Sequence, residues 1–323
     1  MKFLELPILA IIVPCYNEED VLPITAPLFL KKIQSLIEEG LVAKNSRIVF
    51  VDDGSKDDTW KIISNLSKQS VHCTGLRQSR NRGHQNAVYA GLMESKNWAD
   101  ITISIDCDGQ DDIDAMDEMI FAYMQGAEIV YGVRNDRDSD KFFKKTTAHL
   151  FYKMLDLMGV EAIYNHADYR LVSSKVLNEF KKFDEVNLFL RGMFPLVGFN
   201  SSAVYYKRNE RVAGKSKYPL NKMINLAFDG ITSLSVKPIR LVTVLGLLMA
   251  FISFLVILWI FIKFFSGQTV SGWASNGTLV SLFCGVQLVC LGIIGEYIGK
   301  IYLEVKHRPK YIISDRTEIE HGD

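Results

Sequence analysis

Short apolar runs alternate with longer mixed stretches through the N-terminal half of the chain. Runs rich in Val, Ile and Leu predict strands, and the stretches between them predict helices. The predicted strands span residues 6–13, 47–51, 74–78, 101–105 and 128–133, and the predicted helices residues 21–39, 59–68, 86–95, 114–125 and 146–158. This regular alternation predicts an α/β fold with a mostly parallel sheet and right-handed crossovers.

The C-terminal part of the chain contains two long apolar segments. Residues 241–262 carry no charged side chain, and neither do residues 277–294, from which a helix can continue to residue 298 with Glu296 near its end. A helix needs about 20 apolar residues to cross the hydrocarbon core of a bilayer. We therefore predict two transmembrane helices within residues 237–299, at about 241–262 and 277–298. Two buried core helices are the alternative.

Basic residues flank the two predicted spans on one side only. Lys237 and Arg240 precede the first span, a basic group follows the second, and residues 264–276 between them hold no Lys or Arg. The positive-inside rule then places both ends in the cytoplasm. We expect a multi-pass protein of the cell membrane, with a cytosolic catalytic domain at residues 1–214 and a cytosolic tail at residues 300–323.

Residues 215–236, directly before the first span, show one apolar helical face opposite a polar one. In this position the pattern predicts an amphipathic helix lying in the membrane interface. A helix packed on the globular domain has the same pattern, so that alternative stays open.

The composition gives few further indications. The chain has 323 residues, and its 37 Lys and Arg balance 37 Asp and Glu, so nothing indicates a nucleic-acid partner. The five cysteines form no metal-ligand spacing and no CxxC pair, which favours a reducing compartment over a disulfide framework. The N-terminus shows no signal-peptide cleavage pattern.

Four carboxylates follow the predicted strand at residues 101–105. They are Asp106, Asp108, Asp111 and Asp112, with Gln110 among them. Oxygen ligands of this kind suit Mg²⁺ or Mn²⁺, and ligands of open α/β sheets bind at the carboxyl ends of the strands. A solvated acidic turn that caps the next helix is the alternative. Cys107 points away from its neighbours along an extended chain, so we do not expect it to be a ligand.

Six motifs occur in order along the chain: PCYNEED, VDDGSKDDT, RNRGHQNAVYAGL, IDCDGQDD, ADYRL and RVAGKSKY. Any one of them is weak evidence, but the ordered set resembles the GT-A glycosyltransferases of family 2. With the two C-terminal spans, the chain is similar to the polyprenyl-phosphate glycosyltransferases, a group that includes O-antigen glucosyl carriers and dolichol-phosphate mannose synthase. The resemblance covers nearly the whole chain.

This resemblance implies a nucleotide site at the first three motifs, where a simple turn at each strand end is the alternative. Residues implied to contact the base, the ribose or their surroundings are Pro14, Tyr16, Asn17, Glu18, Asp53, Asn81 and Gly83. Gly83 would allow the backbone to approach the ligand closely.

The resemblance also implies a metal site in which Asp106, Asp108 and Gln110 hold Mg²⁺ or Mn²⁺ against the donor diphosphate. The residues after Gln110 depart from the pattern of relatives, and the roles of Asp111 and Asp112 stay open.

Further charged residues are implied to act on the phosphates. Asp108, Arg134 and Asp168 are implied to be catalytic, and Arg170 to organise the site; a buried Asp–Arg pair is the structural alternative for the last two. Arg211, Lys215 and Lys217 are implied to meet a lipid phosphate, although anionic lipids favour such basic segments in any case.

The implied reaction is inverting transfer of one hexose from a nucleotide diphosphate sugar, UDP-glucose or UDP-N-acetylglucosamine, to undecaprenyl or another polyprenyl phosphate. The product would be a lipid-linked sugar for modification of cell-envelope glycans. Two alternatives are a processive polysaccharide synthase, whose Q-x-x-R-W motif this chain lacks, and a non-catalytic, membrane-tethered nucleotide-sugar binding protein. The oligomeric state stays open, a homo-oligomer included.

Overall fold

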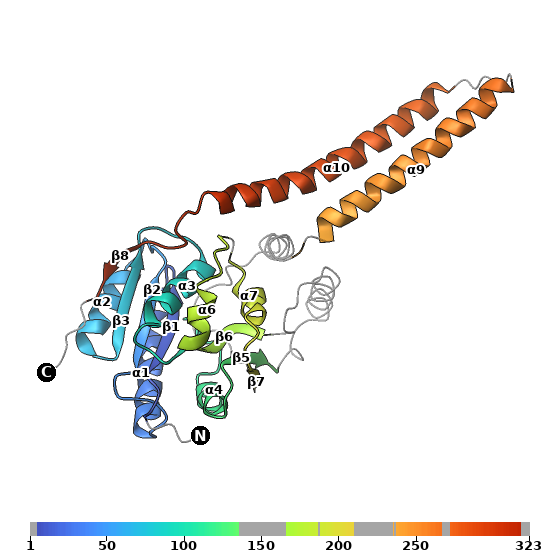
Figure 1. Ribbon diagram of the computed structural model, residues 1–323. Coiled ribbons are helices and arrows are strands. Elements are labelled where there is room, and N and C mark those ends of the chain that lie inside the picture. Colours follow the sequence, from blue (N-terminus) through green and yellow to red (C-terminus); the bar gives the residue numbers. More distant parts are fainter. Residues whose placement is uncertain are drawn as a thin grey trace.

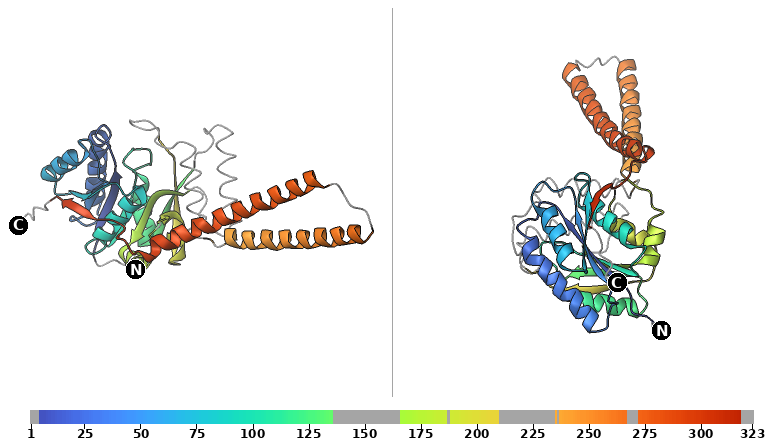
Figure 2. Two further views of the ribbon diagram at one scale, coloured as in Figure 1. Left: turned by 90° about the horizontal axis from the view of Figure 1, so that it is seen from above. Right: turned by 90° about the vertical axis from the view of Figure 1, so that its left-hand side faces the viewer.

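One sheet with helices on both faces forms the globular part of the molecule, and a helical hairpin projects from it (Figures 1 and 2). The computed structural model describes residues 5–135, 166–186, 188–209, 235, 237–266 and 272–317. The elements of the globular part are β1 (Leu9–Cys15), α1 (Leu22–Glu38), β2 (Arg47–Asp52), α2 (Thr59–Gln69), β3 (Cys73–Gln78), α3 (His84–Ser95), β4 (Ile101–Ser104), α4 (Ala115–Met124), β5 (Ile129–Arg134), β6 (His166–Ser173), α6 (Ser174–Phe180), α7 (Leu190–Leu196) and β7 (Ser201–Tyr206). The C-terminal elements are α9 (Lys237–Phe265), α10 (Trp273–Val305) and β8 (Ile313–Arg316).

The described strands form an eight-stranded sheet in the order β7-β5-β6-β4-β1-β2-β3-β8. Strand β1 pairs in parallel with β2 and β4, β2 with β3, and β5 with β7. These pairings confirm the predicted α/β fold with a mostly parallel sheet.

Strand β6 interrupts the simple alternation that the sequence predicts. It lies antiparallel between β4 and β5, and it carries the ADYRL motif. Its register places Arg170 beside Ser104 of β4 and Tyr131 of β5. The insertion therefore brings Asp168 and Arg170 into the middle of the sheet, close to the carboxyl end of β4.

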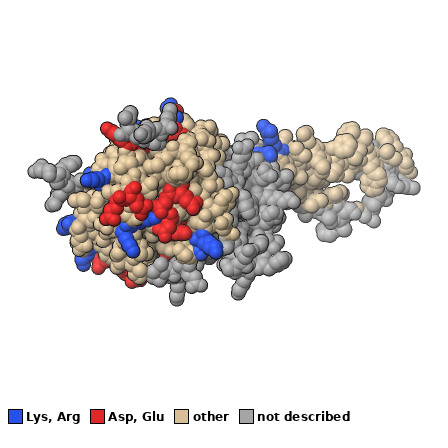
Figure 3. All heavy atoms as spheres, turned by 90° about the horizontal axis from the view of Figure 1, so that it is seen from below, with Lys and Arg blue, Asp and Glu red and all other residues tan. Residues whose placement is uncertain are grey.

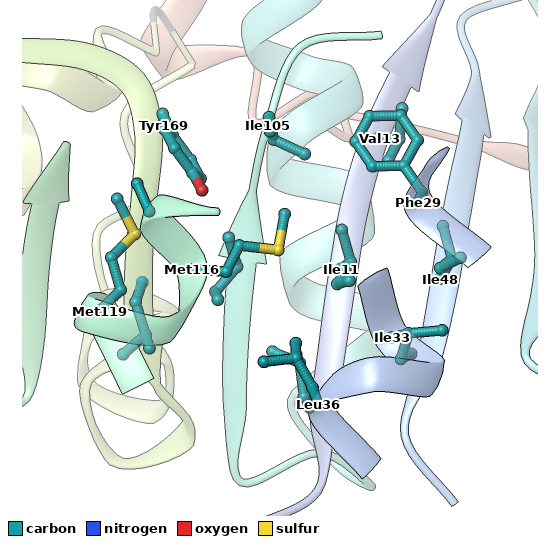
Figure 4. Close-up of a cluster of buried hydrophobic side chains, with 14 of the residues drawn as sticks. Ile11, Val13, Phe29, Ile33, Leu36, Ile48, Ile105, Met116, Met119 and Tyr169 are labelled. Atoms are coloured by element: carbon teal, nitrogen blue, oxygen red, sulfur yellow. The ribbon is translucent and has the colours of Figure 1, made fainter. Parts of the chain in front are cut away.

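Both faces of β1 are buried, because helices cover the sheet on both sides. Ile11 and Val13 pack with α1 and α4, together with Ile48, Ile105 and Tyr169, as Figure 4 shows. The alternate residues Ala10 and Ile12 pack with α3, α6 and α7 on the opposite face. Side chains of a strand alternate between faces, so this uninterrupted apolar run supplies both halves of the core.

The projecting hairpin consists of α9 and α10, which run side by side away from the sheet (Figures 1 and 2). Lys237–Val256 and Leu282–Val305 are long and apolar enough to cross a membrane, and they are 0% and 6% buried within the protein. Charged side chains visible in Figure 3 lie on the globular part and at the base of the hairpin. The low burial argues against the alternative of core helices.

The chain returns to the sheet after the hairpin, which the sequence analysis did not anticipate. Strand β8 pairs antiparallel with β3, and Thr317 Oγ1 accepts a hydrogen bond from the amide of Gly75 at 2.8 Å. Residues 313–317 of the predicted tail are thus attached to the sheet of the globular part. The predicted helices at residues 146–158 and 215–236 lie outside the described residues.

Candidate active site

Three of the sequence motifs meet where parallel strands end. The register pairs Cys15 of β1 with Asp52 of β2, and Ile12 of β1 with Ser104 of β4. The segments that follow β1, β2 and β4 therefore leave the sheet at the same edge. This is the edge at which open α/β sheets bind their ligands.

The turn after β1 is fastened to the loop after β2. Ser55 Oγ accepts a hydrogen bond from the Asn17 amide at 2.9 Å, and Asn17 Oδ1 accepts one from the Lys56 amide at 3.0 Å. The Glu18 amide donates to Thr59 Oγ1 at 2.8 Å. Asn17 has a φ of 51°, a left-handed conformation that asparagine tolerates better than most residues. Asn17 thus shapes the predicted nucleotide site, while Pro14 is buried and Tyr16 and Glu18 are half-buried beside it.

Asp53 holds the RNRG loop that precedes α3. Its two carboxylate oxygens accept hydrogen bonds from the amides of Arg82 and Gly83 at 2.8 and 2.9 Å. Burial raises the pKa of Asp53, although the two amide hydrogen bonds act in the opposite direction. Asp53 therefore fixes Gly83 and Arg82, the residue after Asn81, and a direct contact of Asp53 with base or ribose stays a prediction.

Gly54 lets the two loops meet. Its φ is +67°, and a Cβ atom there would lie 2.5 Å from the carbonyl carbon of Arg80. No other residue type fits this close backbone approach without a shift of the loop.

Asp106 and Asp108 follow the end of β4, where the chain enters a turn. Both are half-buried, whereas Ile105 and Cys107 between and beside them are buried in the core. The Cys107 sulfur lies 3.6 Å from Thr25 Oγ1, in agreement with the expectation that it is not a ligand. Burial raises the pKa of Asp106 to about 6, against the effect of the nearby His84 and with a contribution from the neighbouring acids.

Asp111, whose role the sequence left open, is a structural residue. It is 2% exposed, and one of its oxygens accepts hydrogen bonds from Tyr206 at 2.6 Å and from Arg134 at 2.9 Å. Arg134 also donates to the Tyr206 hydroxyl at 3.2 Å. This arrangement anchors Arg134 at the rim of the acidic segment, so a contact with a phosphate would have to come from its remaining surface.

Asp112 has a local role. Its Oδ1 accepts a hydrogen bond from the amide of Asp114, the residue before α4, at 3.0 Å. The acidic turn thus combines both interpretations of the sequence. Asp112 shapes the start of a helix, while Asp106 and Asp108 face away from the core.

Asp168 is the centre of a cluster of cations. Its carboxylate accepts hydrogen bonds from Arg170 at 2.7 Å and from Arg191 Nε and Nη2 at 3.0 and 2.9 Å. Burial alone would raise the pKa of Asp168, but Arg191, His84 and Arg170 outweigh it and hold the pKa well below its usual range. The buried Asp–Arg pair considered from the sequence is therefore present.

His84 connects this cluster to the first acid of the DxD motif. Its Nε2 lies 3.5 Å from Asp106 and 3.6 Å from Asp168. Burial disfavours the imidazolium, but these two carboxylates more than compensate and raise the pKa of His84 to about 9. His84 is thus a cation between two acids at neutral pH.

Sequence reasoning missed Arg191. It lies on α7, a short helix whose neighbouring residues Leu190, Met193 and Phe194 are buried. The available signal was an arginine inside the apolar stretch FLRGMFPL, because an arginine among buried residues usually has a carboxylate partner. Its partner, however, lies on a different strand and could not be named.

The donor set fits a cation that arrives with a phosphate ligand. Among the described residues, no three His, Cys, Asp or Glu side chains form a complete metal site. Mg²⁺ commonly uses one or two carboxylates and takes its other ligands from substrate phosphates and water. Asp106 and Asp108 match that pattern, while Gln110 Oε1 accepts a hydrogen bond from Arg208. Arg211, Lys215 and Lys217 lie outside the described residues.

Comparison with known proteins shows the family of this chain. Residues 10–180 match the model of glycosyl transferase family 2, and residues 237–301 match the GtrB C-terminal hairpin. The uncharacterized glycosyltransferase YkoT of Bacillus subtilis (strain 168) is 50% identical over 307 residues, which cover 95% of this chain and 91% of the relative. The bactoprenol glucosyl transferase of Shigella phage SfV is 39% identical over 312 residues, covering 96% and 99%.

A solved structure of glucosyl-3-phosphoglycerate synthase from Mycobacterium tuberculosis, in complex with Mn²⁺, UDP and phosphoglyceric acid, has a TM-score of 0.46 at 15% identity and covers 71% of this chain and 77% of that chain. The family model covers more than half of this chain, and the two sequence relatives align with it almost from end to end. The chain belongs to glycosyl transferase family 2: it is a glycosyltransferase with a GT-A fold and a GtrB-type C-terminal hairpin.

Proposed function

We propose that this glycosyltransferase moves glucose from UDP-glucose to a polyprenyl phosphate at the cytosolic face of the cell membrane. One observation carries the proposal. The carboxylates of the DxD motif and an apolar hairpin that could enter a bilayer belong to the same chain, and the hairpin starts beside the catalytic sheet (Figure 1). A relative that aligns with 96% of this chain is named bactoprenol glucosyl transferase.

The cluster around Asp168 supports a mechanism that needs no strong general base. A phosphate monoester is anionic at neutral pH and is already a nucleophile. The Asp168 oxygens accept hydrogen bonds from two arginines, and the depressed pKa makes this carboxylate a weak proton acceptor. We infer that Asp168 orients Arg191 and Arg170, and that catalysis rests on positioning and charge stabilisation.

The donor side would be held by the edge formed after β1, β2 and β4. Asp106 and Asp108, with Gln110 beside them, would hold Mg²⁺ or Mn²⁺, which stabilises charge on a leaving diphosphate when it is bound. Tyr16, Glu18 and the RNRG loop held by Asp53 would form the nucleotide side. Direct attack by the acceptor phosphate on the opposite face of the sugar would invert the anomeric centre.

One assay tests this proposal. Purified protein in detergent is given undecaprenyl phosphate, Mg²⁺ or Mn²⁺, and a panel of radiolabelled nucleotide sugars. We expect label in the lipid fraction from UDP-glucose. If only UDP-N-acetylglucosamine labels the lipid fraction, the transferred sugar is N-acetylglucosamine and not glucose. A long water-soluble polymer would favour a processive synthase. No transfer from any donor would contradict the proposal.

A further inference from the structure

The segment of chain that leads into α7 also contacts the helical hairpin. This segment begins at Val186 and ends at Leu190 and Arg191, the first two residues of α7. Contacts at the two ends come from different parts of the molecule: the hairpin holds Val186, and the active site holds Arg191. Residues 186–191 therefore connect the base of the hairpin to the active site over a short length of chain.

At the hairpin end, Glu304 accepts a hydrogen bond from the Val186 amide. Its two carboxylate oxygens lie 2.8 and 2.9 Å from that nitrogen. Glu304 is in the last turn of α10, beyond the span predicted at residues 277–298. Lys310 adds a second contact, donating to the carbonyl oxygen of Phe183 at 2.5 Å. Hydrogen bonds with one charged partner are stronger than neutral ones, so these contacts fix the stretch before α7.

At the active-site end, Gln85 joins the same stretch to Asp168. Gln85 Oε1 accepts a hydrogen bond from the Leu190 amide at 3.2 Å, and its Nε2 lies 3.4 Å from Asp168 Oδ2. The next residue, Arg191, donates bidentate hydrogen bonds to the same Asp168 carboxylate. Leu188, Phe189 and Leu190 are buried, so this stretch is packed as well as hydrogen-bonded.

The base of α10 is itself held on the catalytic domain by the residues that follow it. Tyr311 and Arg316 both donate to Glu94 of α3, at 3.0 and 2.6 Å. The rings of Tyr311 and Tyr89 lie 6.1 Å apart. Since α3 begins with His84 and Gln85, the end of α10 is fixed to a helix whose first turn lines the active site.

We propose that Glu304 is a positioning residue: by holding Val186, it sets the place of α7 and of Arg191 relative to an acceptor phosphate delivered at the membrane surface. The identity of that acceptor rests on the proposed function. Loss of the Glu304 contact frees the start of the stretch, while Gln85 and Asp168 still hold its end. With only these contacts left, Arg191 is held less firmly, and we expect weaker use of the acceptor with the donor side unchanged.

The test compares full-length Glu304→Ala and Glu304→Gln with the unaltered protein. Glu179→Ala is the matched control, because Glu179 lies on α6 and forms a local ion pair with Lys182, three residues along the chain. Hydrogen exchange of a peptide covering residues 183–190 is measured without substrate. We expect exchange about tenfold faster in Glu304→Ala, a smaller change in Glu304→Gln, which keeps one acceptor oxygen, and none in the control.

The same variants are then assayed with undecaprenyl phosphate and UDP-glucose. We expect the KM for the lipid to rise roughly three- to tenfold in Glu304→Ala, with the KM for the nucleotide sugar unchanged. A general loss of folding would instead lower the melting temperature and affect both substrates. Unchanged exchange at residues 183–190 would overturn the positioning role whatever the acceptor is. Absence of transfer by the unaltered protein would overturn the proposed function and the acceptor effect, while the exchange result still decides the contact.

Discussion

At the scale of single residues, Asp108 is the side chain whose charge we expect to matter most for transfer. Its neutral isostere Asp108→Asn keeps the shape of the acidic segment but removes a ligand charge. We expect transfer to fall by roughly 10²- to 10³-fold, the range seen when one electrostatic stabiliser is removed. Initial rates with radiolabelled UDP-glucose measure this. The control variant is Asp112→Asn, which keeps the oxygen that accepts the hydrogen bond from the Asp114 amide. Its transfer rate should be close to that of the unaltered protein.

Arg191 provides a second prediction at this scale. Arg191→Lys keeps the positive charge but replaces two parallel hydrogen bonds to Asp168 with a single point contact. We expect a loss of about 1–2 kcal/mol in stability, after allowing for the partial exposure of Arg191. The melting temperature of the detergent-solubilised protein should fall by about 2–4 °C per kcal/mol. A melting temperature equal to that of the unaltered protein would show that the second hydrogen bond is dispensable.

The sequence was informative about which acids lie at the ligand edge but not about what they contact. Asp106 and Asp108 could be assigned to this edge because they directly follow a strand, and the end of a buried strand can be predicted from the end of its apolar run. The distinction between Asp108 and Asp111 could not be made, because Asp111 is buried by Tyr206 and Arg134, which come from two other strands. Arg191 was missed for the same reason: its partner Asp168 lies on an inserted antiparallel strand.

At the scale of elements, the two apolar segments are helical as predicted, because about 20 uncharged residues in succession are typical of a helix that spans a membrane. Helices α9 and α10 both extend beyond the predicted bounds. Strands β6, β7 and β8 were not predicted. Strand β6 is inserted against the direction of its neighbours, and β8 is a short exposed segment whose pairing depends on where the hairpin returns the chain. Neither property is encoded in local periodicity.

The direction of the hairpin in the membrane is a prediction that labelling can decide. Gly272 lies at the start of α10, at the end of the hairpin far from the sheet (Figure 1). The positive-inside rule places this end outside the cell. Gly272→Cys should react with a membrane-impermeant maleimide on intact cells, above the level given by the protein without the substitution. Reaction only after lysis would reverse the orientation.

Removal of the hairpin should separate donor binding from use of a lipid acceptor. Truncation before Lys237 would also delete β8 and expose the edge of β3, so it is a poor test. Ser235 and Tyr297 are close, since the Tyr297 hydroxyl donates to the Ser235 carbonyl at 2.6 Å. A flexible linker from Ser235 to Lys300 therefore keeps the end of α10 and β8. We expect UDP binding, measured by calorimetry, to persist and the KM for undecaprenyl phosphate to rise at least tenfold. An unchanged KM for the lipid would contradict the role of the hairpin.

At the scale of the whole molecule, charge and hydrophobicity are distributed unequally. Acidic and basic residues balance over the chain, and the hairpin presents apolar surface that the protein does not bury. Hydrophobic insertion, unlike attraction between surface charges, is not screened by salt. We expect the full chain to stay in the membrane fraction at about 1 M salt, where the Debye length is about 3 Å. Immunoblots of pelleted and soluble fractions measure this, and release by salt would indicate electrostatic attachment instead.

The late return of the chain to β3 also orders the biogenesis of the protein. Strand β8 is synthesised after both helices of the hairpin, yet it covers the edge of a sheet whose other strands are complete much earlier. Until residues 313–317 leave the ribosome, the amides and carbonyls along that edge of β3 are open to other chains, as at any free edge strand. Synthesis of the hairpin thus precedes completion of the sheet, and a chain that lacks residues 313–317 keeps an exposed edge at β3.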